Sequence, residues 1–251
     1  MLKAILFDMD DTLIDWSGRV QDWLEYEREH LNFLIDHLTG AGHTVPNADH
    51  FFTSVRQFAS DSWVDSAASL RAPRYAEAIL KAMEQIGIPI TDFDEDSVLR
   101  ALKWKMIAGV VAFPDVLEVL PVLVSHNLQL GLITNASTPM WLRDTELEEV
   151  GLLHYFSDCR LSAVDVGYLK PHPAIFQHAL DKLQLQPSEV VFVGDNPEAD
   201  VSGAQSVGMK AVLRVVQKPG IITSRLFTPD ARIDTFHELP AILDEWYPGW
   251  R

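Results

Sequence analysis

The sequence predicts an α/β protein in which a doubly wound parallel sheet forms the core and an α-helical domain is inserted into that core. Two observations lead to this fold class. Short apolar segments alternate with helical patterns over most of the chain, which is typical of repeated strand–helix–strand units. One long interval near the N-terminus, in contrast, contains helical patterns alone. The 251 residues provide enough chain for a core with an insert.

Five short segments rich in β-forming residues are the expected strands. Three of them are nearly continuous apolar runs, as expected for strands that are covered on both faces. In chain order the expected strands are residues 4–7 (AILF), 128–134 (LQLGLIT), 154–162 (HYFSDCRLS), 190–194 (VVFVG) and 211–216 (AVLRVV).

Helical patterns separate the later strands. They cover residues 115–126, 141–152, 174–185 and 198–209. Strand–helix alternation of this kind implies right-handed crossovers, and such crossovers produce a parallel sheet with helices packed on it.

The interval 16–111 contains no segment comparable to these strands. Its helical patterns cover residues 19–42, 72–87 and 94–110, and the first of them ends at two glycines. That first pattern places five apolar residues on one stripe: Leu24, Leu31, Leu34, Ile35 and Leu38. We therefore expect an α-helical domain of residues 16–111 and a core built from residues 1–15 and 112–251.

Acidic residues outnumber basic ones, with 36 Asp and Glu against 20 Lys and Arg, which leaves a formal charge of −16. This excess argues against non-specific nucleic-acid binding and against docking on an anionic membrane, because both depend on basic residues. A small phosphorylated ligand can still bind, since local positive groups or a metal ion can outweigh the overall field.

Cys159 is the single cysteine, so no internal disulfide can form and a reducing cytoplasm is the expected compartment. Its neighbourhood in the sequence is not rich in histidine, which argues against a nucleophilic thiol. We expect no signal peptide, because the first strand follows almost directly on Met1, and no apolar run is long enough to span a bilayer.

Polar residues follow the expected strands where ligands bind in an open parallel sheet, beyond the carboxyl ends. Asp8 follows the first strand, Thr134 ends the second and Asn135 follows it, Lys170 lies in the segment after the third, and Asp195 follows the fourth. These side chains are expected to meet at one edge of the sheet although they are far apart in the sequence.

Four carboxylates crowd the segment after the first strand: Asp8, Asp10, Asp11 and Asp15. Because like charges repel, this crowding predicts a positive partner, most simply a metal ion.

The fragments DMDDT, LITNAS, GYLKPHPAIF and VGDNPEAD resemble the four ordered motifs of the haloacid dehalogenase superfamily. Each fragment alone is a weak signal, but the four occur in the right order, each near the end of an expected strand. The resemblance implies a Rossmann-like core with a first-type (C1) helical cap, inserted where the sequence shows its helical interval. It further implies a phosphatase-type member of the superfamily.

By this resemblance, Asp8 is the nucleophile that forms an aspartyl-phosphate, a role that suits a carboxylate ionised at neutral pH. Asp10 donates a proton to the leaving alkoxide and then accepts one from the attacking water. Thr134 and Asn135 bind the phosphoryl group through a hydroxyl and a main-chain N–H, and Lys170 neutralises its growing charge.

The resemblance also implies Mg²⁺ as the cofactor, held by a carboxylate of Asp8, the main-chain carbonyl of Asp10 and a carboxylate of Asp195. Asp200 either supports this site or is only an acid in the first turn of a helix that Asn196 and Pro197 open. Asp11 and Asp15 are interpreted as solvated loop acids.

Three further residues have expected structural roles. Thr12 either holds the loop through its hydroxyl or is an ordinary turn residue. Ser137 or Thr138 is expected to cap a helix whose first residue is Pro139, which would bring a helix N-terminus close to the anion.

The function favoured by these observations is a Mg²⁺-dependent phosphatase acting on a small phosphorylated metabolite. A phosphomutase of the same family remains an alternative. A 2-haloacid dehalogenase is less favoured, because a leaving halide needs no proton and Asp10 would have no task. A non-catalytic phosphate-binding protein is the fourth possibility. The candidates for substrate contacts from the helical domain are Trp16, Arg19, Arg71 and Arg74, and the sequence selects none of them. It also indicates neither the substrate nor the oligomeric state.

Overall fold

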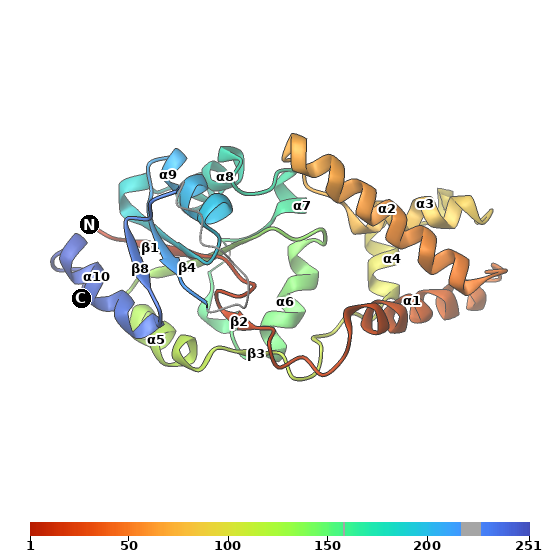
Figure 1. The fold of residues 1–251 in the computed structure, drawn as a ribbon, viewed down its shortest axis with the longest axis horizontal. Coiled ribbons are helices and arrows are strands. Elements are labelled where there is room, and N and C mark those ends of the chain that lie inside the picture. The colour runs from red at the N-terminus through yellow and green to blue at the C-terminus, as the bar shows by residue number, and fades with distance from the viewer. Residues whose placement is uncertain (158, 217–226) are drawn as a thin grey trace.

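The computed structural model describes residues 1–157, 159–216 and 227–251. A parallel sheet lies at one end of the elongated molecule, with helices packed around it (Figure 1). Within these residues the sheet has six strands in the order β5-β4-β1-β6-β7-β8. Their bounds are β1 Ala4–Phe7, β4 Gln129–Thr134, β5 Arg160–Ser162, β6 Val190–Gly194, β7 Lys210–Arg214 and β8 Ala231–Ile233. Every pairing in it is parallel, which confirms the predicted doubly wound sheet.

The expected strand 154–162 is shorter than predicted. Only Arg160–Ser162 pairs with the sheet, while Leu153–Tyr155 forms a 3₁₀ turn (η2), and residue 158 lies outside the described residues. The short edge strand β8 was not predicted, because its three residues include the exposed Arg232 and show no apolar run.

Helices cover both faces of the sheet, and the strand residues alternate between them. Ile5 and Phe7 of β1 pack in one core cluster with α5 (Pro114–Ser125) and α10 (Leu239–Trp246). Ala4 and Leu6 pack in another with α8 (Pro173–Leu183) and α9 (Gly203–Ser206). Because both faces are buried, β1 needs apolar residues at every position.

Four helices within the described residues form the insert, and they lie together at one end of the molecule, beyond α6 (Met140–Glu149) and α7 (Ala163–Val166) (Figure 1). They are α1 Trp23–Gly40, α2 Ala48–Ser69, α3 Tyr75–Gln85 and α4 Glu95–Ala101, and they enclose an apolar core of their own. Helix α2 was missed from the sequence because its buried large residues are confined to its first two turns, so no long apolar stripe marks it.

Two short strands bring the connections of the insert together. β2 (Ile14–Asp15) leads out of the core and β3 (Val111–Ala112) leads back, and the two pair antiparallel. None of the helices that the structure describes combines the length and the apolar composition needed to cross a membrane.

The same two connections touch again at a pair of glycines. Gly109 has a φ of +88°, a left-handed conformation, and a Cβ added there would lie 2.1 Å from the main-chain oxygen of Gly18. Such a separation is shorter than any stable contact between these atoms, so the crossing of the two connections requires glycine.

We expect Gly109→Ala to lower the free energy of unfolding measured by urea denaturation. Gly151→Ala is the matched control, because Gly151 also has a positive φ of +75° but faces open space. The control should lose about 1 kcal/mol from backbone strain. Gly109→Ala should lose about 2 kcal/mol more, because the added methyl group also displaces the other connection. Equal losses in the two variants would show that the glycine contact does not constrain the structure.

Candidate active site

A cavity of about 180 Å³ opens at the carboxyl ends of β1, β4 and β6. The six site residues predicted from the sequence all line it: Asp8, Asp10, Thr134, Asn135, Lys170 and Asp195. The parallel sheet therefore places them together, because the carboxyl ends of neighbouring parallel strands lie at the same edge of the sheet.

Lys170 is buried between two carboxylates. Its Nζ lies 2.6 Å from Oδ1 of Asp8 and 2.7 Å from Oδ1 of Asp200. Burial acts to lower the pKa of Lys170, but the charges of Asp200 and Asp8 outweigh it and raise the pKa above its ordinary value. Lys170 is therefore a permanent cation at the base of the cavity.

Asp8 is held at both oxygens. Lys170 contacts Oδ1, and the buried hydroxyl of Thr12 donates to Oδ2 at 3.1 Å, so the hydroxyl of Thr12 reaches the site itself. Burial raises the pKa of Asp8 to about 8; Lys170 opposes the rise, and the neighbouring acids Asp200, Asp195 and Asp10 add to it. The ionisation of Asp8 at neutral pH stays a prediction, and a cation bound beside it would favour the ionised form.

The carboxylates of the cavity fit a divalent cation. Oxygen atoms of Asp8, Asp195 and Asp200 all lie within 4.8 Å of one another. Carboxylate oxygens are the ligands that Mg²⁺ prefers, and a cation between them would oppose the raised pKa of Asp8. The expected ligand from Asp10 is a main-chain carbonyl, which stays a prediction.

Asp200 belongs to the site and is more than an acid in the first turn of a helix. Its side chain is buried, pairs with Lys170, and accepts from the main-chain N–H of Asn196 at 2.9 Å. The side chain of Asp200 packs against Gly194 at the end of β6. A Cβ added to Gly194 would lie 2.3 Å from Oδ2 of Asp200. The helical turn η4 (Pro197–Ser202) that carries it opens at Asn196 and Pro197, as predicted.

Asn135 has a contact that the sequence did not reveal. Its side-chain amide donates to the main-chain oxygen of Lys170 at 3.0 Å and accepts from the main-chain N–H of Lys170 at 2.7 Å. This double hydrogen bond fixes the backbone that carries the buried cation. The hydroxyl of Thr134 is buried and lies 3.5 Å from Oδ2 of Asp10.

The predicted cap of the following helix is wrong. Helix α6 begins at Met140 with Pro139 as its N-cap, and Asp165 accepts from the main-chain N–H of Met140 at 3.0 Å. The main-chain oxygens of Ser137 and Thr138 instead accept hydrogen bonds from the main chain of α3 and from Ser162. Tertiary contacts thus replace the local cap.

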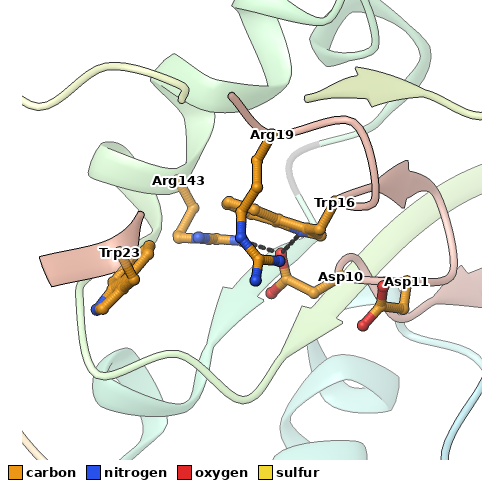
Figure 2. A pocket seen from close by; sticks show the side chains of 6 residues that line it. All are labelled: Asp10, Asp11, Trp16, Arg19, Trp23 and Arg143. Carbon is orange, nitrogen blue, oxygen red and sulfur yellow. Dashed lines mark hydrogen bonds and ion pairs between the residues drawn. The ribbon is translucent and has the colours of Figure 1, made fainter. Parts of the chain in front are cut away.

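Arg143 on α6 is a site residue that the sequence analysis missed. Its Nη2 lies 2.6 Å from Oδ1 of Asp10, and the indole N–H of Trp16 donates to the same oxygen at 3.0 Å (Figure 2). Arg143 is buried, whereas the side chain of Asp10 is 38% exposed, so the ion pair reaches from the protein interior to the cavity. One carboxylate oxygen of Asp10 is therefore held by two groups.

Glu146 connects Arg143 to the helical insert. Its Oε2 lies 2.6 Å from Nη1 of Arg143, and its Oε1 accepts from the indole N–H of Trp104 at 2.7 Å. Burial raises the pKa of Glu146 to about 6, while the charge of Arg143 opposes the rise. An Arg and a Glu three residues apart on a helix were visible in the sequence, but their burial was not.

The other residues considered from the sequence lie mostly outside the site. Arg74 pairs with Glu95, and Arg71 lies over the ring of Tyr168. Trp16 and Arg19, in contrast, line a cavity of about 450 Å³ beside Asp10 (Figure 2).

Cys159 is buried within a core cluster, and its thiol faces the main-chain oxygen of Ala179 at 3.7 Å. Burial raises its pKa to about 11, so the nucleophilic thiolate is scarce at neutral pH.

Residues 2–208 match the family model of the haloacid dehalogenase-like hydrolases. A ribulose-1,5-bisphosphate 5-phosphatase of Halopiger xanaduensis is 37% identical over 219 residues, which cover 85% of this chain and 84% of that protein. A phosphoglycolate phosphatase of Salmonella typhimurium is 33% identical over 243 residues, which cover 96% and 92% of the two chains.

Among solved structures, a 2-haloacid dehalogenase of Pseudomonas syringae pv. Tomato superposes with a TM-score of 0.62 and 27% identity. The superposition covers 98% of this chain and 100% of that chain, so it includes both the sheet and the helical insert.

We expect Arg143→Met to lower the free energy of unfolding by about 3 kcal/mol, because it leaves the buried Glu146 without its cation. The double variant Arg143→Met with Glu146→Gln should regain most of this loss, since the unpaired charge is then removed. Thermal unfolding of the two variants and the wild type measures both effects. A double variant that is less stable than Arg143→Met would contradict the proposed ion pair.

Proposed function

The chain belongs to the haloacid dehalogenase-like hydrolases and is a phosphoric monoester hydrolase, and we propose that it hydrolyses a small phosphorylated metabolite with Mg²⁺ through an aspartyl-phosphate on Asp8. The observation that carries this proposal is the buried Asp8 facing Lys170, with the carboxylate of Asp10 held at the same cavity.

In the first step, a carboxylate oxygen of Asp8 attacks phosphorus and the bond to the ester oxygen breaks. Asp10 gives its proton to the departing alkoxide. Lys170 neutralises charge on the nucleophile and the phosphoryl oxygens, while the hydroxyl of Thr134 and the main-chain N–H of Asn135 bind those oxygens. Asp8, the main-chain carbonyl of Asp10 and Asp195 would hold Mg²⁺, which would supply further positive charge to the site.

In the second step, the carboxylate of Asp10 takes a proton from a water molecule, which attacks phosphorus and releases phosphate. The bond between Asp8 and phosphorus breaks, and the free carboxylate returns. Arg143 and Trp16 hold Asp10 in place for both proton transfers. The helical insert acts as a cap that shields the intermediate.

A phosphomutase would share these core residues and would differ by returning an isomer in place of free phosphate. The phosphatases among the relatives favour hydrolysis. Asp10 likewise favours hydrolysis of a phosphate ester over dehalogenation, because only an alkoxide needs its proton. The expected cytoplasmic location stays a prediction.

Asp8→Asn should abolish phosphate release from every substrate, because the amide oxygen is a poor nucleophile. Asp10→Asn should reduce kcat about 10²-fold to 10⁴-fold on alkyl phosphates and much less in the first step with p-nitrophenyl phosphate. The reason is that p-nitrophenolate leaves without a proton. Single-turnover measurements of p-nitrophenol release separate the first step from the second.

Asp15→Asn is the control for these two variants. Asp15 is an acid of the same segment, its carboxylate accepts from the main-chain N–H of Ser17, and an asparagine oxygen can accept the same bond. Its activity should match the wild type. Equal activity of Asp8→Asn and wild type would mean that the nucleophile is another residue.

Mg²⁺ should raise the thermal unfolding temperature, because it binds the folded carboxylate cluster and not the unfolded chain. At a Mg²⁺ concentration 100 times Kd the gain is about 2.7 kcal/mol of unfolding free energy. Asp195→Asn should abolish most of this shift without needing any assay of turnover. An equal shift in Asp195→Asn and wild type would place the ion elsewhere.

A further inference from the structure

A second cavity, of about 220 Å³, adjoins the cavity of about 180 Å³ in which Asp8 and Lys170 lie. Asp10 and Asn135 line both. If phosphorus lies against Asp8 as proposed, the ester oxygen faces Asp10, and the group attached to that oxygen extends into the second cavity. Unlike the cavity of about 450 Å³ beside Asp10, this cavity also shares Asn135 with the site of the phosphoryl group, so it fits the leaving group better. This inference rests on the proposed function.

The helical insert lines this cavity with four aromatic side chains, and we call it the aromatic cavity. They are Trp23 from α1, Trp63 from α2, Tyr75 from α3 and Trp104 from the segment after α4. Four separate segments thus present rings to the same space beside the reacting group.

Two of these rings are exposed although they are large and apolar. Trp23 is 45% exposed and Trp63 is 42% exposed, and neither belongs to the buried core of the insert. Exposed indoles at a concave site are typical of a surface that binds a ligand, because folding does not need them there.

The other two rings have fixed orientations. The hydroxyl of Tyr75 donates to Glu27 at 2.9 Å, and the indole N–H of Trp104 donates to Glu146 at 2.7 Å. The ring of Trp104 stands edge to face with those of Trp23 and Tyr75, with angles of 64° and 66°. Because the hydroxyl of Tyr75 and the indole N–H of Trp104 already donate these hydrogen bonds, the two side chains offer only ring faces and edges to a ligand.

Charge in the aromatic cavity disfavours an anionic leaving group. Among the described residues that line it, Arg143 is the only cation, and Asp10 and Glu146 already pair with it. A carboxylate on the substrate would find no available cation there. A quaternary ammonium can also bind to aromatic walls, and phosphocholine tests that alternative below.

We propose that the substrate is a phosphate monoester of an alcohol that carries an aromatic or heteroaromatic ring, bound in the aromatic cavity. This differs from the ribulose bisphosphate and phosphoglycolate that name two relatives of the chain. Trp63 is the residue on which this selectivity depends most directly, because it is exposed and makes no ring contact among the described residues.

The first test compares substrates that all release a simple alkoxide, so that differences reflect binding. We would measure Mg²⁺-dependent phosphate release from benzyl phosphate, cyclohexylmethyl phosphate, glycerol 3-phosphate, 2-phosphoglycolate and phosphocholine. Benzyl phosphate should have a kcat/KM at least about tenfold above each of the others. A preference for another substrate, or equal values for benzyl and cyclohexylmethyl phosphate, would overturn the inference and leave the proposed function standing.

Variants of Trp63 locate the selectivity. Trp63→Leu should reduce the ratio of kcat/KM for benzyl phosphate to that for glycerol 3-phosphate about tenfold, whereas Trp63→Phe should keep most of it. Val64→Ala is the matched control, because Val64 is an exposed apolar residue of the same helix outside the cavity. An unchanged ratio in Trp63→Leu would assign the selectivity elsewhere and overturn the role of this residue.

A binding experiment separates this inference from the proposed function. Calorimetric titration with Mg²⁺ present compares benzylphosphonate with methylphosphonate, which share the anionic group and differ in the ring. Tighter binding of benzylphosphonate to wild type, reduced in Trp63→Leu, supports the aromatic cavity even if no substrate is hydrolysed. Equal binding of the two overturns it. Absence of any release sensitive to Asp8→Asn contradicts the proposed function alone.

Discussion

The site depends on one buried cation held between two carboxylates. Lys170 lies 2.6 Å from Asp8 and 2.7 Å from Asp200, and all three side chains are buried. A buried lysine is stable only if its partners are held against it, so the ends of β1 and β6 must be aligned with the loop after α7. The sheet register provides this alignment, and the amide of Asn135 fixes the lysine backbone within it. Three carboxylates, of Asp8, Asp195 and Asp200, lie close to this one lysine, and the excess of negative charge is the electrostatic reason for a cation in the site.

The helical insert is tied to the same chemistry through its two connections. The outgoing connection carries Trp16, which bonds Asp10 directly, and the returning connection carries Trp104, which reaches Asp10 through Glu146 and Arg143. The strands β2 and β3 keep these connections side by side. The position of the insert and the position of the proposed proton donor are therefore linked by hydrogen bonds and ion pairs, and the same insert builds the aromatic wall of the cavity next to Asp10.

Prediction from sequence succeeded where burial leaves a local pattern. Residues 4–7 and 190–194 are covered on both faces, so their apolar runs mark strands without ambiguity. Prediction failed for elements that are set by contacts with other parts of the fold and carry no local apolar pattern. Helix α2 buries little along most of its length, the edge strand β8 is short, and the N-terminus of α6 takes its cap from Asp165 and none from Ser137 or Thr138.

The sequence by itself determined the order of the strand ends and the polar residues placed at them, because strand periodicity and motif spacing are local properties of the chain. It therefore located Asp8, Asp10, Thr134, Asn135, Lys170 and Asp195. Only the tertiary structure decided that Asp200 shares Lys170 with Asp8, that Arg143 reaches Asp10 across 133 residues of chain, and that Asp8 is buried deeply enough to raise its pKa. Distances between remote residues, and the desolvation that shifts their protonation, arise only when the layers of the fold pack together.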